Sequence, residues 1–296
     1  MSAAVGEPVA GLSFVKLEAT GNDFVVVDED GSAEGPEPAL SVSVRMALCA
    51  RHTGVGADGV LTILPARADA VAAGATFRMH ITNPDGSVPE MCGNGLRCVA
   101  RHLAETGRID VESAVVIDTD AGPRTVVVAR DFGSVTINMG RAALDSQRQF
   151  PVRFDRTALD NVGVDSVPAT SVSMGNPHVV LEVSSLPDRH TAARLGPALE
   201  FDRQRFPERT NVEWVVDRAD GDLDVLVWER GAGLTQACGT GACAVTAALV
   251  HHGRRGAGTT VCHLPGGPLR ITVTTLAEPI FMEGPVRRVF AGVWSG

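Results

Sequence analysis

Two cysteines share a short pattern that is suited to chemistry. Cys92 and Cys238 are each followed by Gly-x-Gly, in MCGNG and ACGTG, and each pattern directly precedes a segment with helical spacing of its apolar residues. A free thiol titrates at about 8.5, and the unpaired amides of a helix N-terminus can lower that pKa to roughly 3.5 to 7.5. Each turn therefore predicts a thiolate, and its amides and glycines predict a site for a carboxylate.

The two turns lie 146 residues apart (238 − 92), close to half of the 296-residue chain. This spacing predicts two related halves, each presenting one cysteine at the start of a helix. Inversion of an α-carbon needs a base on one face, an acid on the other, and amides that hold the enediolate formed between the two steps. The pair therefore predicts an amino-acid epimerase that needs neither cofactor nor metal. For either turn alone, a buried structural cysteine beside a tight glycine turn is the competing interpretation.

Four further cysteines, Cys49, Cys98, Cys243 and Cys262, lie in apolar segments without the glycine turn and are predicted to be buried structural thiols. Six cysteines would permit three disulfides in a secreted protein, but the chain is large and shows no signal peptide, which favours reduced thiols. No C-x-x-C pair occurs, and the spacings do not fit zinc sites.

Composition narrows the class of protein. A length of 296 residues with 44% hydrophobic content favours two domains. The 35 acidic and 26 basic residues give a net charge of −9, and the basic residues are scattered, which argues against a nucleic-acid partner. No apolar run approaches the roughly 20 residues of a membrane span, and the N-terminus has no signal pattern. We expect a soluble, cytoplasmic protein that acts on a small molecule.

Hydrophobic periodicity predicts similar elements in both halves. In the first half, strands are expected at 14–17, 24–27, 60–64, 77–81, 115–117, 125–128 and 134–138, with helices at 42–50 and from 92 to a stop at Gly107. In the second half, strands are expected at 179–183, 212–216, 223–228, 269–273 and 280–282, with a helix at 239–251. A segment rich in Asp and Pro at 150–168 predicts a loop.

Six segments of the chain resemble the diaminopimelate epimerase family, in one order and nearly from end to end. They are ATGNDFVVVD (19–28), RHTGVGADG (51–59), NPDGSVPEMCGNGLRC (83–98), SMGNPH (173–178), FPERTN (206–211) and ERGAGLTQACGTGACA (229–244). A set of this size in this order is highly specific.

The resemblance implies an α+β fold of two pseudo-twofold related domains, each a mixed, curled β-sheet around a central helix, with the active site in the interdomain cleft. The expected domains are residues 1–139 with 283–296, and residues 140–282. A C-terminal strand at 284–290 is expected to return to the first domain. The implied activity is cofactor-independent epimerisation of LL-2,6-diaminopimelate to meso-diaminopimelate, a step that serves lysine and peptidoglycan precursor biosynthesis.

Carried over by position, Cys92 and Cys238 are implied to be acid and base, exchanging roles with the direction of reaction. The backbone amides of Gly93, Asn94, Gly239 and Thr240 are implied to bind the reacting carboxylate. The rest of the substrate is assigned to Asn22, Asn83, Asn176, Asn211, Glu229 and Arg230, and the tuning of the thiols to His178 with Glu229. Taken one at a time, each asparagine also fits a turn or cap, as in TGND and NPDG.

Three departures from the family pattern stand out. Gly59 occupies a position where some members carry a substrate-contacting glutamine, and Leu234 replaces a glutamate common in GAGET. The chain has no tyrosine, so the possible homodimer cannot use a tyrosine contact.

Two other functions fit part of the sequence. A proline or hydroxyproline racemase shares the paired Cys-Gly-x-Gly turns, but that family resembles MCGHG and PCGTGT, whereas Asn94 and Ala237 stand here. A thiol redox or zinc-binding module is permitted by the cysteine count alone, and bound metal or a stable disulfide essential to activity would favour it.

Overall fold

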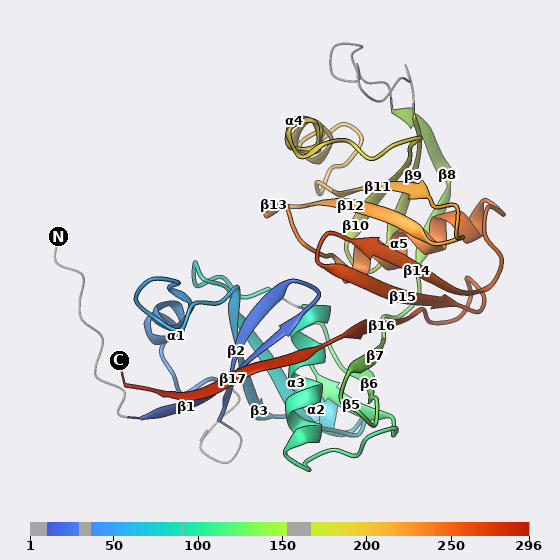
Figure 1. Cartoon of the computed structure of the whole chain (residues 1–296). Helices are drawn as coiled ribbons and strands as arrows, with labels where there is room; N and C mark the ends of the chain where they lie inside the picture. Colours follow the sequence, from blue (N-terminus) through green and yellow to red (C-terminus); the bar gives the residue numbers. More distant parts are fainter. Residues whose placement is uncertain (1–10, 30–36, 90, 153–166, 296) are drawn as a thin grey trace. The chain divides into compact units, whose positions relative to one another are not determined.

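The computed structural model describes residues 11–29, 37–89, 91–152 and 167–295. The chain divides into two compact units, Met1–Ile137 with Gly284–Gly296 and Asn138–Glu283. In Figure 1 the first unit contains the blue to green elements and the red strand β17, and the second contains the elements from yellow-green β8 to red-orange β15.

The sheet of the first unit is mixed. Its described strands pair in the order β17–β1–β2–β3–β4–β5–β6–β7, in which only β2–β3 and β4–β5 are parallel. The strands are β1 (Leu12–Ala19), β2 (Asn22–Asp28), β3 (Gly59–Pro65), β4 (Ala75–Thr82), β5 (Val115–Asp118), β6 (Arg124–Val128), β7 (Ser134–Asn138) and β17 (Arg287–Trp294).

The sheet of the second unit is also mixed. Its described strands pair in the order β8–β9–β10–β11–β12–β14–β15–β16, in which only β10–β11 and β12–β14 are parallel. The strands are β8 (Ala143–Val152), β9 (Val167–Ser173), β10 (Pro177–Glu182), β11 (Asn211–Asp217), β12 (Leu223–Glu229), β14 (Gly258–Leu264), β15 (Gly267–Val273) and β16 (Phe281–Pro285), with the short β13 (Gly233–Leu234) paired to β12.

The two sheets follow one pairing rule. From β17 and from β8 onward, the successive pairs are antiparallel, antiparallel, parallel, antiparallel, parallel, antiparallel and antiparallel. This agreement extends the similarity of the two cysteine turns to the topology of both units. The fold is α+β, as predicted.

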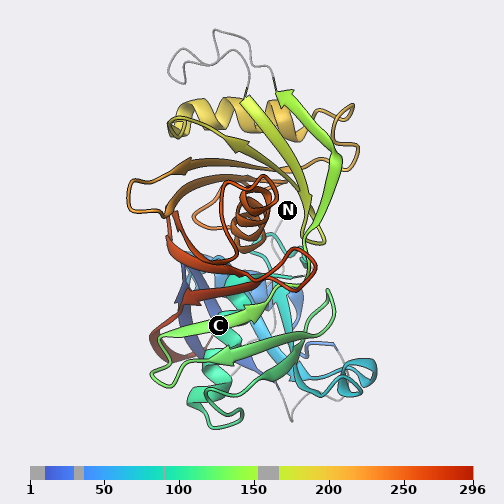
Figure 2. The same cartoon turned by 90° about the vertical axis from the view of Figure 1, so that its right-hand side faces the viewer.

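Each unit has one long helix against the inner face of its sheet. Helix α3 (Gly93–Glu105) packs on β1, β2, β3, β4 and β6, and α5 (Gly239–His251) packs on β9, β10, β11 and β15. Figure 2 shows α5 close to end-on, with strands of its own unit around it. Both helices end in a glycine of positive φ, Gly107 at 69° and Gly253 at 66°, which is the geometry that ends a helix in a left-handed cap.

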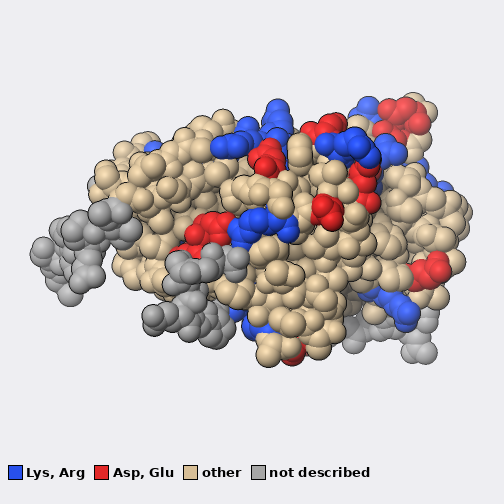
Figure 3. Space-filling model, turned by 90° about the horizontal axis from the view of Figure 1, so that it is seen from below, with Lys and Arg blue, Asp and Glu red and all other residues tan. Residues whose placement is uncertain are grey.

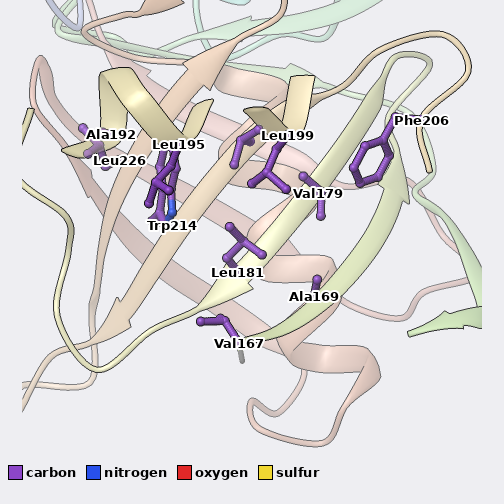
Figure 4. Close-up of a cluster of buried hydrophobic side chains, with 11 residues drawn as sticks. Val167, Ala169, Val179, Leu181, Ala192, Leu195, Leu199, Phe206, Trp214 and Leu226 are labelled. Atoms are coloured by element: carbon purple, nitrogen blue, oxygen red, sulfur yellow. The ribbon is translucent and has the colours of Figure 1, made fainter. Parts of the chain in front are cut away.

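A second, smaller helix covers the outer face of each sheet. In the first unit, α1 (Val42–Cys49) packs on β3 and β4 over a core that includes Val25, Val60 and Leu48, and the short α2 (Ala68–Val71) precedes β4. In the second unit, α4 (Arg189–Glu200) packs on β11 and β12. Figure 4 shows this core, in which Leu195 and Leu199 of α4 belong to one cluster with Trp214 and neighbouring apolar side chains. The strand residues between these outward ones point to α3 or α5.

The sequence patterns missed several elements, chiefly α4, β8, β9 and β14. The loop predicted at 150–168 is wrong at both ends, because Phe150, Pro151 and Val152 of β8 pair with Ala169, Pro168 and Val167 of β9. Among the described strands β8 pairs only with β9, and such an edge strand tolerates proline. Residues 153–166 of that segment lie outside the described part of the chain.

No helix in the described ranges is both long and apolar enough to cross a membrane. On the face seen in Figure 3, acidic and basic side chains lie interspersed, without a large patch of one sign.

Replacement of Gly196 by alanine should destabilise the protein. A Cβ built on Gly196 of α4 would lie 2.3 Å from Cδ2 of Trp228, whose ring is held by a 2.7 Å hydrogen bond from Nε1 to Glu200. Alanine favours a helix by up to about 1 kcal/mol over glycine, but overpacking of this kind costs about 1–3 kcal/mol. We expect a net loss of free energy of unfolding, measured by urea denaturation.

Gly256→Ala is the matched control, because a Cβ there would meet no atom within 4 Å. Its free energy of unfolding should change by less than about 0.5 kcal/mol. A Gly196→Ala protein as stable as the parent would show that α4 does not pack on Trp228 as described.

Candidate active site

Cys92 caps the N-terminus of α3. It has extended backbone angles (φ −140°, ψ 112°), and its Sγ accepts a hydrogen bond from the amide of Gly95 at 3.4 Å. A Cβ on Gly95 would lie 2.9 Å from a methyl group of Leu61, so glycine lets the helix start directly against β3. The thiol is half-buried and lies at the positive end of the helix dipole.

A chain of side-chain hydrogen bonds connects the polar groups beside Cys92. The amide group of Asn94 donates to Asn22 Oδ1 at 2.6 Å, and the amide group of Asn22 donates to Asp58 at 3.1 Å. Beneath them, the fully buried Arg97 donates to Asn94 Oδ1 at 2.7 Å and also to the hydroxyl of Thr20. Burial lowers the pKa of Arg97 to about 10, which leaves its guanidinium charged at neutral pH.

Cys238 repeats this capping geometry in α5. Its backbone angles are φ −120° and ψ 111°, and its Sγ accepts from the amide of Gly241 at 3.4 Å. The sulfur also lies 3.4 Å from the hydroxyl of Thr240. Unlike Cys92, Cys238 is buried.

The expectation that both turns favour a thiolate is wrong for Cys238. Burial raises the pKa of this thiol well above its ordinary value, and the nearby carboxyl groups of Glu229 and Glu213 raise it further. The hydrogen bonds of Thr240 and Gly241 act in the opposite direction but are the smaller effects. Burial and these carboxyl groups therefore favour the protonated form of Cys238.

A buried hydrogen-bond network leads from β11 to Cys238. His178 Nδ1 lies 2.7 Å from Glu213 Oε1, and both side chains are fully buried. His178 Nε2 lies 3.0 Å from Asn176 Oδ1, and the amide nitrogen of Asn176 donates to Thr240 Oγ1 at 3.4 Å. Thr240 then meets the sulfur, so the position of His178 is transmitted to the cysteine turn.

Three further predicted residues gather near the end of β12. Glu229 accepts a hydrogen bond from Thr235. Burial raises the pKa of its carboxyl group, and the hydrogen bond from Thr235 partly offsets this. Asn211 donates to the carbonyl of Pro177 at 2.8 Å and accepts from the amide of Arg230 at 2.9 Å. These contacts tie the Glu229-Arg230 turn to the strand that carries His178.

Arg230 and Asn83 are less constrained than these groups. The guanidinium of Arg230 is exposed and donates to the carbonyl of Glu208 at 2.9 Å. Asn83 bonds within its own turn, where its side chain donates to Ser87 Oγ at 2.9 Å. No contact given by the structure connects Asn83 to the Asn22–Asn94 pair, so its role as a substrate ligand stays a prediction.

The two departures from the family pattern have local explanations. A Cβ on Gly59 would lie 3.1 Å from the carbonyl of Thr82, so this position fits closely against β4. Leu234 forms β13 with Gly233 and packs against the apolar core under α4. An apolar side chain at this position extends that core.

The sequence did not point to Arg97, Glu213 or Thr235. A signal for Glu213 was present, because a single acid inside the apolar strand NVEWVV indicates a buried carboxylate that needs a partner. Likewise, Arg97 interrupts the apolar face of α3. The structure adds both to the surroundings of the cysteines.

Comparison with known proteins identifies the family to which the chain is similar. A family model described as diaminopimelate epimerase matches residues 14–144 and 170–289. A diaminopimelate epimerase of Synechococcus sp. (strain JA-2-3B'a(2-13)) is 43% identical over 294 residues, covering 96% of this chain and 99% of the relative. The diaminopimelate epimerase of Desulforudis audaxviator (strain MP104C) is 40% identical over 290 residues, covering 96% and 99%.

A solved structure shows the same fold at low identity. A hydroxyproline epimerase from Agrobacterium vitis, with bound trans-4-hydroxy-L-proline, aligns with a TM-score of 0.70 and 18% identity over 97% of this chain and 92% of that one. At this identity the likeness shows the fold alone. The fold, the two capping cysteines and the relatives together define an isomerase of the epimerase class. Within that class, the chain belongs to the diaminopimelate epimerase family.

Proposed function

We propose that the chain epimerises LL-2,6-diaminopimelate to meso-diaminopimelate without a cofactor, using Cys92 and Cys238 as its acid–base pair. The observation that carries the proposal is the repeated cap: in each unit the cysteine sulfur accepts a hydrogen bond, at 3.4 Å, from the amide three residues further on. The family match supports the substrate. The product serves lysine and peptidoglycan precursor biosynthesis.

The reaction needs one sulfur on each face of the α-carbon. A thiolate removes the α-proton and becomes a thiol, while the electron pair of the C–H bond moves into an enediolate. The second thiol then delivers its own proton to the opposite face and becomes a thiolate. Protons balance within the pair, and the reverse reaction uses the two sulfurs in the opposite order.

Helix geometry supplies the stabilisation of the enediolate. Gly93 and Asn94 are the first two residues of α3, and Gly239 and Thr240 are the first two of α5. Amides at these positions have no carbonyl partner within their helix and can donate to a carboxylate. We assign the reacting carboxylate to these amides, where developing negative charge is best stabilised.

The remaining predicted residues would hold the distal amino-acid group. Asn22, Asn83, Asn176, Asn211, Glu229 and Arg230 offer amides, a carboxylate and a guanidinium, which match the amino and carboxylate groups of the substrate. His178 and Glu229 would act on Cys238, His178 through Asn176 and Thr240, and Glu229 through its charge.

Epimerisation in deuterium oxide tests the proposal. LL-diaminopimelate should give meso product with one solvent deuterium, at the inverted α-carbon, as read by NMR and mass spectrometry. Lysine and proline should be inert, because unpaired polar groups at the distal site cost about 1–3 kcal/mol each.

Label at both α-carbons before meso product accumulates would contradict recognition of the distal end. Turnover of proline in place of diaminopimelate would favour the racemase alternative.

The wider assignments are also proposals. We assign one epimerase half to residues 1–139 with 283–296 and the other to residues 140–282. A cytoplasmic location and a homodimer stay predictions. For the homodimer, the edge strand β17 offers exposed apolar side chains, among them Val289, Phe290 and Val293, to a second copy.

A further inference from the structure

Strand register identifies equivalent positions in the two units. Parallel β2–β3 pairs Phe24 with Gly59, and parallel β10–β11 pairs His178 with Asn211; Phe24 and His178 each lie two residues after the asparagine of a Gly-Asn turn. Two residues further along the second strand of each pair stand Leu61 and Glu213.

The glycines of the two helices confirm this equivalence. A Cβ on Gly95 would lie 2.9 Å from Leu61, and a Cβ on Gly241 would lie 2.8 Å from Glu213 Oε1. Leu61 and Glu213 therefore occupy the same place beneath the two cysteine turns. Leu61 is apolar, whereas Glu213 carries a carboxyl group.

Two more equivalent pairs differ in charge. Arg97 lies five residues after Cys92, and Cys243 lies five residues after Cys238. Val60 and Val212 are equivalent, since each follows the first residue of its register pair. Thr82 pairs with Val60 and Trp228 pairs with Val212, so these two residues also correspond. The residues that follow them, Asn83 and Glu229, are therefore equivalent as well. The first unit thus has a cation and no carboxylate at these places, and the second has two carboxyl groups and no cation.

The charge of Arg97 is not neutralised by a carboxylate hydrogen bond. Its hydrogen-bond acceptors among the described residues are neutral: the hydroxyl of Thr20, Asn94 Oδ1 and the carbonyl of Pro285, and its Nη1 has none. Two carboxylates beside this network pair with other cations, Glu18 with Arg287 at 2.9 Å and Asp58 with Arg51 at 2.5 Å.

Around Cys238 the balance is reversed. Glu213 is fully buried, and its only hydrogen-bond partner in the described chain is His178, since Oε2 has none. Glu229 comes from β12, and the imidazole of His178 comes from β10. No arginine or lysine bonds to these groups within the described residues.

We infer that Arg97 and Glu213 are positioning residues that polarise two otherwise equivalent thiols, so that the free enzyme rests with Cys92 as the thiolate and Cys238 as the thiol. The inference rests on the proposed function, in which these cysteines are the acid–base pair. A thiolate at Cys92 is the counter-ion that the buried guanidinium lacks, whereas the carboxyl groups of Glu229 and Glu213 oppose a negative charge at Cys238. The resting enzyme therefore starts turnover with Cys92 as base and Cys238 as acid.

NMR of protein labelled with ¹³C at the cysteine β-carbon tests this without turnover, because the β-carbon shift reports ionisation of each thiol. Cys92 is titrated in a Cys238→Ser background, and Cys238 in a Cys92→Ser background, which removes coupling between the two sites. We expect the midpoint of Cys92 to lie at least about two pH units below that of Cys238.

Variants identify the charges responsible. Glu213→Gln keeps a side-chain oxygen for His178 but removes the charge, and should lower the midpoint of Cys238 by about one unit or more. Arg97→Gln should raise the midpoint of Cys92, while Arg97→Lys should restore it. Glu182→Gln is the control. Glu182 lies on the same strand as His178 and pairs with Arg254, so loss of its charge should shift the titration midpoint of neither cysteine.

Equal midpoints, a lower midpoint for Cys238, or a Glu213→Gln protein with an unchanged Cys238 would each overturn the inference. If Arg97→Gln does not fold, Glu213→Gln alone decides the role of charge at Cys238. The outcome is separate from the proposed function, because polarised thiols in a protein that does not epimerise diaminopimelate would refute the function and leave the polarisation standing.

Discussion

Replacement of either Cys92 or Cys238 by serine is expected to lower kcat for diaminopimelate by about a thousandfold or more. Loss of a positioned acid or base costs about 10²- to 10⁴-fold, and a serine hydroxyl is far less acidic than a thiol, so it can replace neither partner at neutral pH. Because Ser has nearly the shape of Cys and can still accept from Gly95 or Gly241, the fold should be preserved. The measurements are kcat and the circular dichroism spectrum of each variant.

Cys262→Ala is the control for loss of a thiol. Cys262 is fully buried on β14, near Thr246, and has no place in the proposed chemistry. Its variant should keep kcat within about twofold, even if the lost volume lowers stability by about 1 kcal/mol. Full activity in either serine variant would refute a mechanism based on two thiols.

Replacement of Arg230 by alanine is expected to lower kcat/KM for diaminopimelate by about 10- to 100-fold. A hydrogen bond to a charged group contributes about 1.5–3 kcal/mol, and every 1.4 kcal/mol corresponds to tenfold. The guanidinium is exposed and bonds only to the carbonyl of Glu208 in the described structure, so the free energy of unfolding should change by less than about 0.5 kcal/mol. Steady-state kinetics and urea denaturation measure the two effects.

Arg254→Ala is the matched control. Arg254 is another exposed arginine of the same unit, paired with Glu182 and Asp217 at 3.0 Å, and it has no assigned role in binding. Its kcat/KM should be unchanged. If both arginine variants lose activity equally, or neither does, Arg230 does not hold the distal end of the substrate.

Most strands and both cysteine helices could be predicted because their signals are local. The Cys-Gly-x-Gly turns are followed by apolar residues at helical spacing, and glycines end both helices. Helix α4 escaped prediction because RHTAARLGPALE contains Gly196 and Pro197, which both disfavour a helix interior. Packing of Leu195 and Leu199 into the apolar cluster that includes Trp214 outweighs that local preference.

In the candidate site, too, some residues could be predicted from local sequence and others could not. Its reactive residues were recognisable because a cysteine at a helix start carries its chemistry in four consecutive residues, and the repeat doubles the signal. The electrostatic environment of each thiol was not recognisable from the sequence, because charges act through space. Glu213 lies 25 residues before Cys238 in the chain (238 − 213), yet β11 holds its carboxyl group against Gly241.

Sequence alone therefore specified two similar halves, their cysteine turns and the type of reaction, since each depends on residues close together in the chain. Whether a turn holds a thiolate or a thiol depends on burial and on charges brought from other strands. Glu213 of β11 and Glu229 of β12, brought beside Cys238, make two nearly identical local motifs electrostatically different, whereas Arg97 comes from the same helix as the Cys92 turn. That difference arises only when the sheets fold around α3 and α5, because desolvation strengthens each charge and register determines which sulfur it faces.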